Sequence, residues 1–116
     1  MCGIWAFINL CSLKPDYIKL YSNFMSFQHR GPDLSSFQTI KNLTVGFHRL
    51  AIMDPTFHAN QPYIIEDNNR TIVFVCNGEI YNFKELIEKH HLDINNNSDC
   101  MTIPKLYIKY NFTRKL

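Results

Sequence analysis

The sequence predicts an α+β protein built around one hydrophobic core. Its 116 residues are 46% hydrophobic and 14% aromatic, which is enough apolar material for one core of useful size. Short apolar runs with strand character are interrupted by segments whose apolar residues recur at helical spacing. The expected order along the chain is a strand, a helix, three strands, a helix and a last helical segment.

The first half of the chain predicts one strand, one helix and a hairpin. Residues 4–8 are apolar and predict a short buried strand. Apolar side chains at helical spacing over residues 16–30 predict an amphipathic helix, and the Gly-Pro pair that follows is a stop signal. Residues 34–40 and 43–53 then predict two strands that are joined by a short polar turn.

The second half is more polar, and its elements are shorter. We interpret residues 55–67 as a loop, whereas the β-branched and aromatic residues 71–76 predict a strand that ends at an Asn-Gly turn signal. A helix over residues 82–91 is expected, with Asn82 as its N-cap. Residues 98–110 form the last segment, and its apolar positions indicate a helix.

Charge and cysteine usage exclude several classes of function. The net charge is +2, from 12 basic and 10 acidic residues spread along the chain, so neither nucleic acid nor an anionic membrane is an expected partner. Metal ligation is not expected either, since no CxxC pair occurs, and the irregular spacing favours reduced thiols. No secretion signal or membrane span is recognisable, so we expect a cytoplasmic location. The four cysteines are Cys2, Cys11, Cys76 and Cys100.

Cys2 directly follows the initiator methionine, which raises the question of whether it becomes the N-terminus. A small second residue generally permits removal of Met1, after which Cys2 would carry both a thiol and a free α-amine. Ordinary thiols have a pKa of about 8.5 and α-amino groups about 7.7 to 8.0, so an uncharged amine can accept the thiol proton near neutral pH. Position alone leaves open the alternative of a buried structural cysteine.

Three further places in the sequence each have a functional and a structural interpretation. Arg49 lies among apolar strand residues, where its guanidinium either binds a carboxylate in bidentate fashion or points to solvent at a strand edge. Asn77, Gly78 and Glu79 follow a strand as a tight turn, or as a place where an amide and an N–H converge on an oxyanion. Asp99, at a helix start, stabilises the helix dipole or receives a substrate ammonium.

Several short motifs occur in a defined order along the chain. They are MCGIWA at 1–6, QHRGPD at 28–33, GFHRLAIMDP at 46–55, QP at 61–62, CNGEIYN at 76–82 and SDC at 98–100. In combination they resemble the N-terminal glutaminase domain of glutamine-hydrolysing asparagine synthetases, which belong to the N-terminal-nucleophile class of amidotransferases. HRGPD together with HRLAIMDP points to the asparagine synthetase branch, and the resemblance covers almost the whole chain.

The resemblance implies glutamine as the substrate and an α-β-β-α sandwich of antiparallel sheets as the fold. Cys2 would attack the side-chain amide of glutamine and release ammonia, and water would hydrolyse the resulting thioester to glutamate, with the Cys2 amine as base and acid. Asn77 and the Gly78 N–H would form the oxyanion hole. The implied substrate contacts are Arg49 at the α-carboxylate, Glu79 and Asp99 at the α-ammonium, and Arg49, Leu50, Ala51, Ile52 and Met53 along the pocket.

The chain departs from the family pattern near its C-terminus. Met101 stands where the family usually has Glu, so Ser98 lacks the reciprocal partner of a capping box. Pro104 falls within the last predicted helix, which we expect to be kinked, shortened or displaced, and the position of Asp99 depends on this helix start. Residues 1–116 are expected to form a partial glutaminase domain that lacks strands of its second sheet and has no synthetase domain.

Three interpretations of function follow. The leading one is the glutaminase part of an asparagine synthetase, in asparagine biosynthesis; it needs no cofactor in this chain, because ATP and magnesium would serve a synthetase domain. The second is an inactive remnant that binds glutamine or a partner, and the third is a half-domain that another chain completes. Glutamine is the expected small-molecule partner, and a second copy of the chain or a separate synthetase chain is the expected protein partner.

Overall fold

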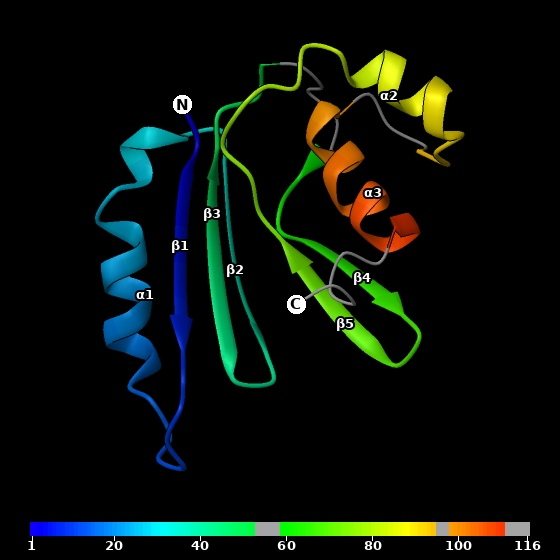
Figure 1. The fold of residues 1–116 in the computed structure, drawn as a ribbon. Helices are drawn as coiled ribbons and strands as arrows, with labels where there is room; N and C mark the ends of the chain where they lie inside the picture. The colour runs from blue at the N-terminus through cyan, green and yellow to red at the C-terminus, as the bar shows by residue number, and fades with distance from the viewer. Residues whose placement is uncertain (53–58, 95–97, 111–116) are drawn as a thin grey trace. The chain divides into compact units, whose positions relative to one another are not determined.

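The chain divides into two compact units. The structure, a computed structural model, describes residues 1–52, 59–94 and 98–110. The first unit spans Met1–Ala51 and the second Ile52–Leu116. Each unit contains an antiparallel sheet and at least one helix, which confirms the predicted α+β class (Figure 1).

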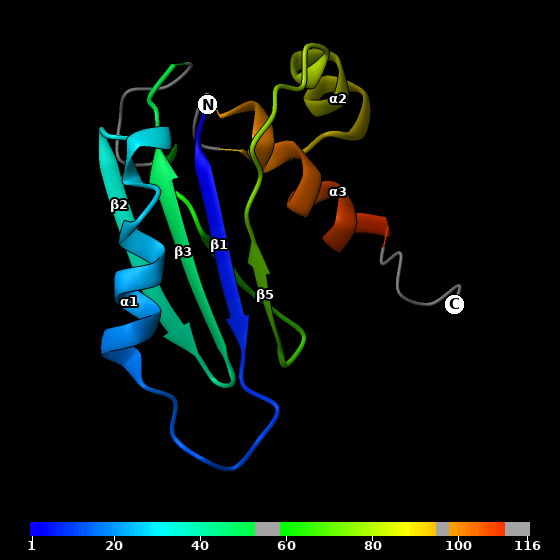
Figure 2. The same ribbon diagram turned by 90° about the vertical axis from the view of Figure 1, so that its left-hand side faces the viewer.

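The first unit is a three-stranded sheet with one helix against it. Strands β1 (Gly3–Ile8), β2 (Leu34–Ile40) and β3 (Leu43–Arg49) are arranged in the order β1-β3-β2, and both pairings are antiparallel. Helix α1 (Tyr17–Met25) runs along one face of this sheet (Figure 2). Strand β3 is therefore central, with a neighbour on each side.

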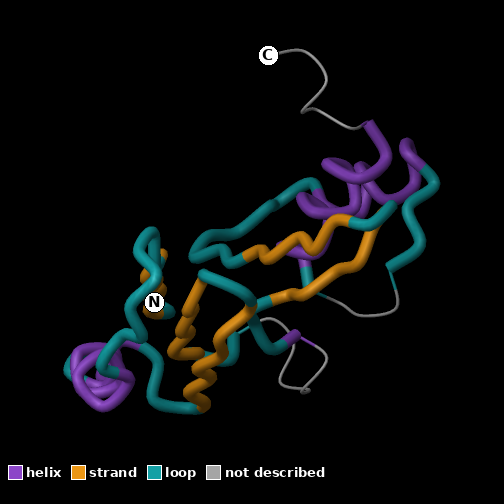
Figure 3. The backbone as a smooth tube through the Cα atoms, turned by 90° about the horizontal axis from the view of Figure 1, so that it is seen from below, coloured by secondary structure: helices purple, strands orange, loops and turns teal. Residues whose placement is uncertain are grey.

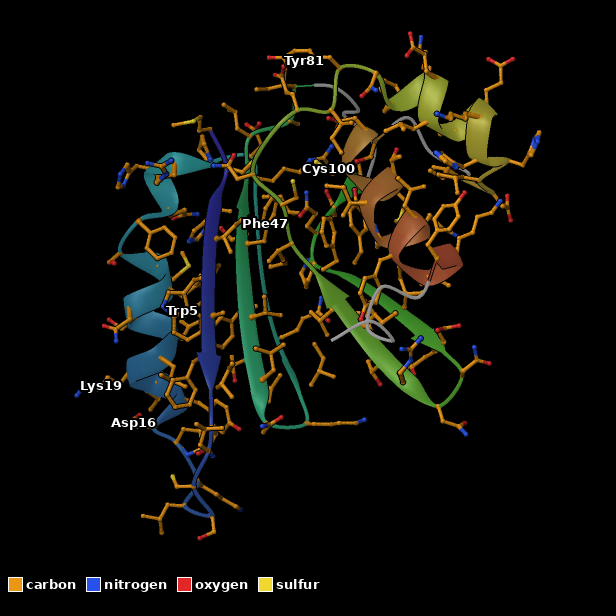
Figure 4. All side chains as sticks on the ribbon, viewed as in Figure 1. Trp5, Asp16, Lys19, Phe47, Tyr81 and Cys100 are labelled. Carbon is orange, nitrogen blue, oxygen red and sulfur yellow. The ribbon has the colours of Figure 1, made fainter. Side chains whose placement is uncertain are left out.

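Aromatic side chains fill the space between α1 and the sheet. Phe24 of α1 is completely buried, and its ring packs against the rings of Trp5 from β1 and Phe37 from β2. Figure 4 shows Trp5 between β1 and α1. Gly46 of β3 lies opposite both Trp5 and Phe37, and its missing side chain makes room for the Phe24 ring. The core of this unit thus depends on one glycine facing one phenylalanine.

His48 joins the helix to two strands. It is fully buried, and its ring stacks on Phe24 with 3.9 Å between ring centroids. Its Nε2 lies 2.8 Å from the Phe24 carbonyl oxygen, which can only accept, so Nε2 carries the proton. Nδ1 lies 2.7 Å from the Ser35 hydroxyl oxygen, which can either donate or accept. Both ring nitrogens are therefore satisfied inside the core.

The sheet of the second unit is a hairpin. Strands β4 (Tyr63–Asp67) and β5 (Arg70–Phe74) pair antiparallel, with Tyr63 opposite Phe74. Asn68 and Asn69 form the two-residue connection, with φ of 47° and 64°. Asparagine tolerates this left-handed conformation better than most residues, so the pair suits a tight hairpin turn.

Two helices complete the second unit. Helix α2 (Phe83–His90) and helix α3 (Thr102–Tyr110) are joined near their C-terminal ends by side-chain contacts. His90 Nδ1 lies 2.6 Å from the Tyr110 hydroxyl, and the Lys109 ammonium donates to the His90 carbonyl oxygen. A short 3₁₀ turn, Asp99–Met101, leads directly into α3.

Helix α1 is shorter than the sequence predicts. The prediction placed a helix over residues 16–30, but α1 ends at Met25, and a separate 3₁₀ turn covers Gln28–Arg30. The Ser26 hydroxyl donates to the Asn23 carbonyl oxygen at 2.7 Å, which satisfies a backbone group at the helix end. A local side-chain bond therefore ends the helix before the Gly-Pro signal.

Three further predictions are corrected. The strand predicted over residues 43–53 ends at Arg49, and Met53 lies outside the described residues. The loop predicted over residues 55–67 is wrong for residues 63–67, which form β4. Strand β5 covers Arg70–Phe74 instead of residues 71–76. The pairing of β4 with β5 depends on the Asn-Asn turn, which the interpretation of the sequence did not recognise.

The starts of α2 and α3 also differ from simple capping rules. Asn82 is the N-cap of α2, as predicted, but its side chain makes no capping hydrogen bond. Ser98, whose capping partner is replaced by Met101, makes no side-chain cap either. Pro104 lies in the first turn of α3, where a missing N–H costs no helical hydrogen bond. The α-helix therefore begins later than predicted, at Thr102, and Pro104 lies in its first turn and not in its interior.

We expect Gly46→Ala to destabilise the first unit by about 1 to 3 kcal/mol, because an added Cβ overpacks a buried core. That Cβ would lie 2.4 Å from a Phe24 ring carbon, and the surrounding rings prevent Phe24 from moving away. Urea unfolding of the purified chain measures the loss.

Gly3→Ala is the matched control for this prediction, because its nearest contact would be 3.1 Å, to the Phe27 ring. It should cost less than Gly46→Ala. Combining Gly46→Ala with Phe24→Leu should cost less than the sum of the two single changes, since the smaller side chain vacates the overlap. Strict additivity would contradict the proposed contact.

Candidate functional site

Cys2 lies just before β1, beside the residue that follows β3. The Leu50 N–H donates to Cys2 Sγ at 3.3 Å, and the thiol lies 3.6 Å from the Leu50 carbonyl oxygen. The side chain is half-buried. Extending the register of β1 and β3 by one pair beyond Gly3 and His48 places Cys2 beside Arg49. The thiol is therefore held by backbone groups and retains partial access to solvent.

Arg49 is the last residue of β3, and its side chain is 7% exposed. Because His48 faces α1 and side chains alternate along a strand, Arg49 lies on the opposite face of the sheet. The alternative of an edge arginine pointing to solvent is wrong, since β3 is central and the side chain is buried. A buried guanidinium is suited to a strong bidentate contact with a carboxylate.

The segment after Arg49 is held by Gly31, which was predicted only as part of a helix stop signal, and by Asp33. Asp33 donates its N–H to the Arg49 carbonyl oxygen at 3.0 Å and accepts the Ala51 N–H on Oδ2 at 2.7 Å. Gly31 packs directly on β3, so that an added Cβ would lie 2.2 Å from the His48 carbonyl oxygen. Gly31 and Asp33 therefore position Arg49 and Ala51, a role that no local spacing in the sequence reveals.

The remaining residues of the predicted pocket lining are less constrained or not described. Leu50 and Ala51 have the backbone hydrogen bonds to Cys2 and Asp33 given above. Ile52 is the first residue of the second unit, and its side chain is 65% exposed. Met53 lies outside the described residues.

In the second unit, the candidate oxyanion residues lie on the loop between β5 and α2, which is teal in Figure 3. Asn77, Gly78 and Glu79 are all exposed. Neither Asn77 nor Gly78 has a positive φ, so they do not form the two-residue hairpin turn that an Asn-Gly pair typically makes. The loop presents them after a strand instead of reversing the chain.

Asp99 is buried at the start of the 3₁₀ turn, with 5% of its surface exposed. Its Oδ2 accepts the Ile80 N–H at 2.6 Å. The neighbouring Cys100 thiol donates to the Gly78 carbonyl oxygen at 3.5 Å. Asp99 and Cys100 therefore hold the backbone of the loop after Asn77, an anchoring role that was not predicted.

Burial raises the pKa of the Cys100 thiol well above its ordinary value. The hydrogen bond to Cys76 and the negative charges that Cys76 and Asp99 carry when ionised act in the same direction. Cys100 thus stays neutral and can donate to Gly78. Figure 4 shows Cys100 at the start of the orange helical segment.

Neither a disulfide nor a candidate metal cluster occurs in the part of the chain that the structure describes. All four cysteines are free. Within residues 1–52, 59–94 and 98–110, no group of three or more His, Cys, Asp or Glu side chains is placed to hold a metal ion. No helix among these residues is long and apolar enough to span a membrane.

Comparison with known proteins decides the family. The family model described as a glutamine amidotransferase domain matches residues 1–114. The chain belongs to this family. Its Cys2, Arg49 and Asn77 therefore lie in an amidotransferase domain, and the expected resemblance is confirmed.

Individual relatives of this amidotransferase domain carry the names of glutamine-hydrolysing asparagine synthetases. A protein of Acanthamoeba polyphaga mimivirus, named as a probable member, is 38% identical over 92% of the chain and 20% of its own length. The mouse protein is 37% identical over 94% of the chain and 19% of its own length, and the maize protein 36% over 95% and 19%. The domain thus spans about a fifth of the length of these relatives.

We expect Asp33→Ala to destabilise the amidotransferase domain by about 1 to 2 kcal/mol, because the Ala51 N–H loses a charged acceptor. Urea unfolding measures the loss, and hydrogen exchange at the Ala51 amide should become faster. Asp93→Ala is the matched control, since Asp93 is exposed, and it should change stability by less than about 0.5 kcal/mol. Equal effects of both changes would contradict the anchoring role.

Cys100 of the folded amidotransferase domain should react with iodoacetamide at pH 8 at least about 10-fold more slowly than the exposed Cys11, because only thiolates react. Raising the pH to 9 should accelerate Cys11 while Cys100 stays largely unmodified, since its thiolate forms only at higher pH. Peptide mass spectrometry measures both rates, and in urea they should converge. Similar rates in the folded domain would argue against the neutral, buried thiol.

Proposed function

We propose that the chain carries the glutaminase reaction of an asparagine synthetase, in which glutamine and water give glutamate and ammonia. The observation that carries the proposal is the position of Cys2, whose half-buried thiol lies against the Leu50 backbone next to the buried Arg49. The arrangement supports the proposal, because a thiol lies next to a guanidinium in a domain of the amidotransferase family. The names of the relatives supply the same reaction class.

The nucleophile in this proposal is the Cys2 thiol after removal of Met1. The free α-amine of Cys2 accepts the thiol proton, and the sulfur attacks the side-chain carbonyl carbon of glutamine. A carbon–sulfur bond forms, and the electron pair of the carbonyl double bond moves to oxygen. No separate histidine base and no cofactor are needed for this step.

Asn77 and Gly78 stabilise the resulting oxyanion in the proposed mechanism, through the side-chain amide and the backbone N–H. Removing one such donor typically costs about 2.7 to 4 kcal/mol of transition-state stabilisation. The protonated Cys2 amine then gives its proton to the departing nitrogen, and ammonia leaves. Water, activated by the same amine, hydrolyses the thioester to glutamate and restores the thiol.

Charged side chains would orient the substrate. Arg49 binds the α-carboxylate of glutamine, and its burial supports this role because water competes less for a buried guanidinium. Glu79 and Asp99 receive the α-ammonium group. A carboxylate has several acceptor positions, so Asp99 can accept a further hydrogen bond besides the one from the Ile80 N–H. The resemblance implies that residues 50–53 line the pocket.

The wider assignments rest on the same resemblance. We propose the N-terminal-nucleophile sandwich of antiparallel sheets for the domain, which the antiparallel sheet and helices within each unit support. The ammonia would be used by a synthetase domain working with ATP and magnesium, on the same polypeptide or on a partner chain. These assignments concern proteins of about five times the aligned length.

The purified chain should release ammonia from glutamine, and Asn77→Ala should lower kcat by about 100- to 1000-fold with a smaller change in KM. Cys2→Ala should abolish the reaction, because it removes the nucleophile. A glutamate dehydrogenase assay measures the ammonia, and mass spectrometry of the N-terminus tests whether Met1 is removed.

Cys11→Ala is the matched control, since Cys11 is exposed and outside the proposed machinery. This variant should keep wild-type activity. A folded chain with retained Met1, or ammonia release that is independent of Cys2, would overturn the proposed mechanism. Wild-type activity of Asn77→Ala would remove only the oxyanion assignment.

A further inference from the structure

Gln61 makes a two-point contact with the backbone of Cys76. Its side-chain amide donates from Nε2 to the Cys76 carbonyl oxygen at 3.1 Å, and its Oε1 accepts the Cys76 N–H at 2.6 Å. Gln61 is 7% exposed. The contact is therefore shielded, and it satisfies both backbone polar groups of one residue.

The Gln61 side chain extends the hydrogen bonding of the β4–β5 ladder beyond its last backbone pair. The ladder ends where Tyr63 pairs with Phe74, and the same register extended by two residues would place position 61 opposite Cys76. Pro62 intervenes and has no N–H, and β4 starts only after it. The side-chain amide of Gln61 supplies the donor and the acceptor that a strand backbone would otherwise provide.

A primary amide is suited to this task, because it presents one donor and one acceptor side by side, as a peptide group does. A carboxylate would turn an acceptor toward the Cys76 carbonyl oxygen, and an apolar side chain would leave both Cys76 groups without this partner. A shorter amide would reach less far. The catalytic roles proposed above do not use the QP motif at residues 61–62. The contact with Cys76 explains why a glutamine suits position 61.

Cys76 immediately precedes Asn77, so fixing its two peptide groups sets the direction in which the loop begins. The loop is held a second time where the Ile80 N–H meets Asp99. Asn77 and Gly78 therefore lie between two anchored points, although their own surfaces are exposed. A short exposed segment between fixed ends can present donors in a defined direction.

We propose that Gln61 is a positioning residue for the oxyanion donors Asn77 and Gly78, an inference that rests on the glutaminase function proposed above. Gln61 acts through Cys76 and has no contact with substrate in this proposal. Donors aimed at a developing charge are effective only when their positions are set in advance, and a displacement of about 1 Å can cost about 100-fold in rate. Loss of Gln61 should therefore lower kcat more than it raises KM.

The test compares Gln61→Met and Gln61→Glu with the wild-type chain. Gln61→Met keeps the side-chain length and removes both hydrogen bonds, so kcat for glutamine should fall by about 10- to 100-fold. Hydrogen exchange at the Cys76 amide should become at least about 10-fold faster, because an unprotected amide exchanges more readily. Gln38→Glu, at an exposed position of β2, is the matched control and should change neither quantity.

Gln61→Glu adds a readout that a merely structural role would not move. The new carboxyl repels the Cys76 carbonyl oxygen when ionised and can donate to it when protonated. The ratio of variant to wild-type kcat should therefore rise as the pH is lowered from 8 toward 5.5. A pH-independent ratio would contradict the proposed donor role.

The outcomes separate this proposal from the function on which it rests. If the wild-type chain does not hydrolyse glutamine, the function fails and the positioning role falls with it, whatever the exchange data show. If the wild type is active and Gln61→Met loses Cys76 protection but keeps its kcat, the positioning role alone is overturned. Unchanged Cys76 protection in a folded Gln61→Met chain would refute the contact itself.

Discussion

The close approach of Gly31 to the end of β3 is the constraint on which the Cys2 region depends. Any side chain at position 31 would overlap the backbone at His48 and Arg49, so only glycine permits this packing. The approach brings Asp33 to the Arg49 and Ala51 backbone, which in turn directs Leu50 toward Cys2. A contact between two backbone segments thus controls where a nucleophilic side chain can lie.

In both units, side chains bind the backbone of the loop that follows a strand. Backbone groups beyond the last ladder pair still need partners, and distant side chains supply them. Asp33 serves Ala51 in the first unit, and Gln61 and Asp99 serve Cys76 and Ile80 in the second. The loops that carry the candidate chemistry therefore have defined conformations without belonging to regular secondary structure.

The sequence predicts those parts whose signals are local. An apolar run indicates β1, alternation and turn residues indicate the β2–β3 hairpin, and Asn82 as an N-cap indicates α2. Strand β4 is missed because its turn is an Asn-Asn pair, which is not among the usual hairpin signals. The role of Gln61 cannot be predicted, because its partner lies 15 residues away across an unrecognised pairing.

The Gln61–Cys76 contact joins neutral groups, and this distinguishes it from the charged contacts proposed for the substrate. Dissolved salt weakens attractions between charges at the surface but has little effect on a shielded bond between two amides. Ionic strength should therefore act on the encounter of the exposed Glu79 with an ammonium group and leave the path of the backbone into Asn77 unchanged. The direction of the loop and its attraction for charged ligands are thus set by separate physical forces.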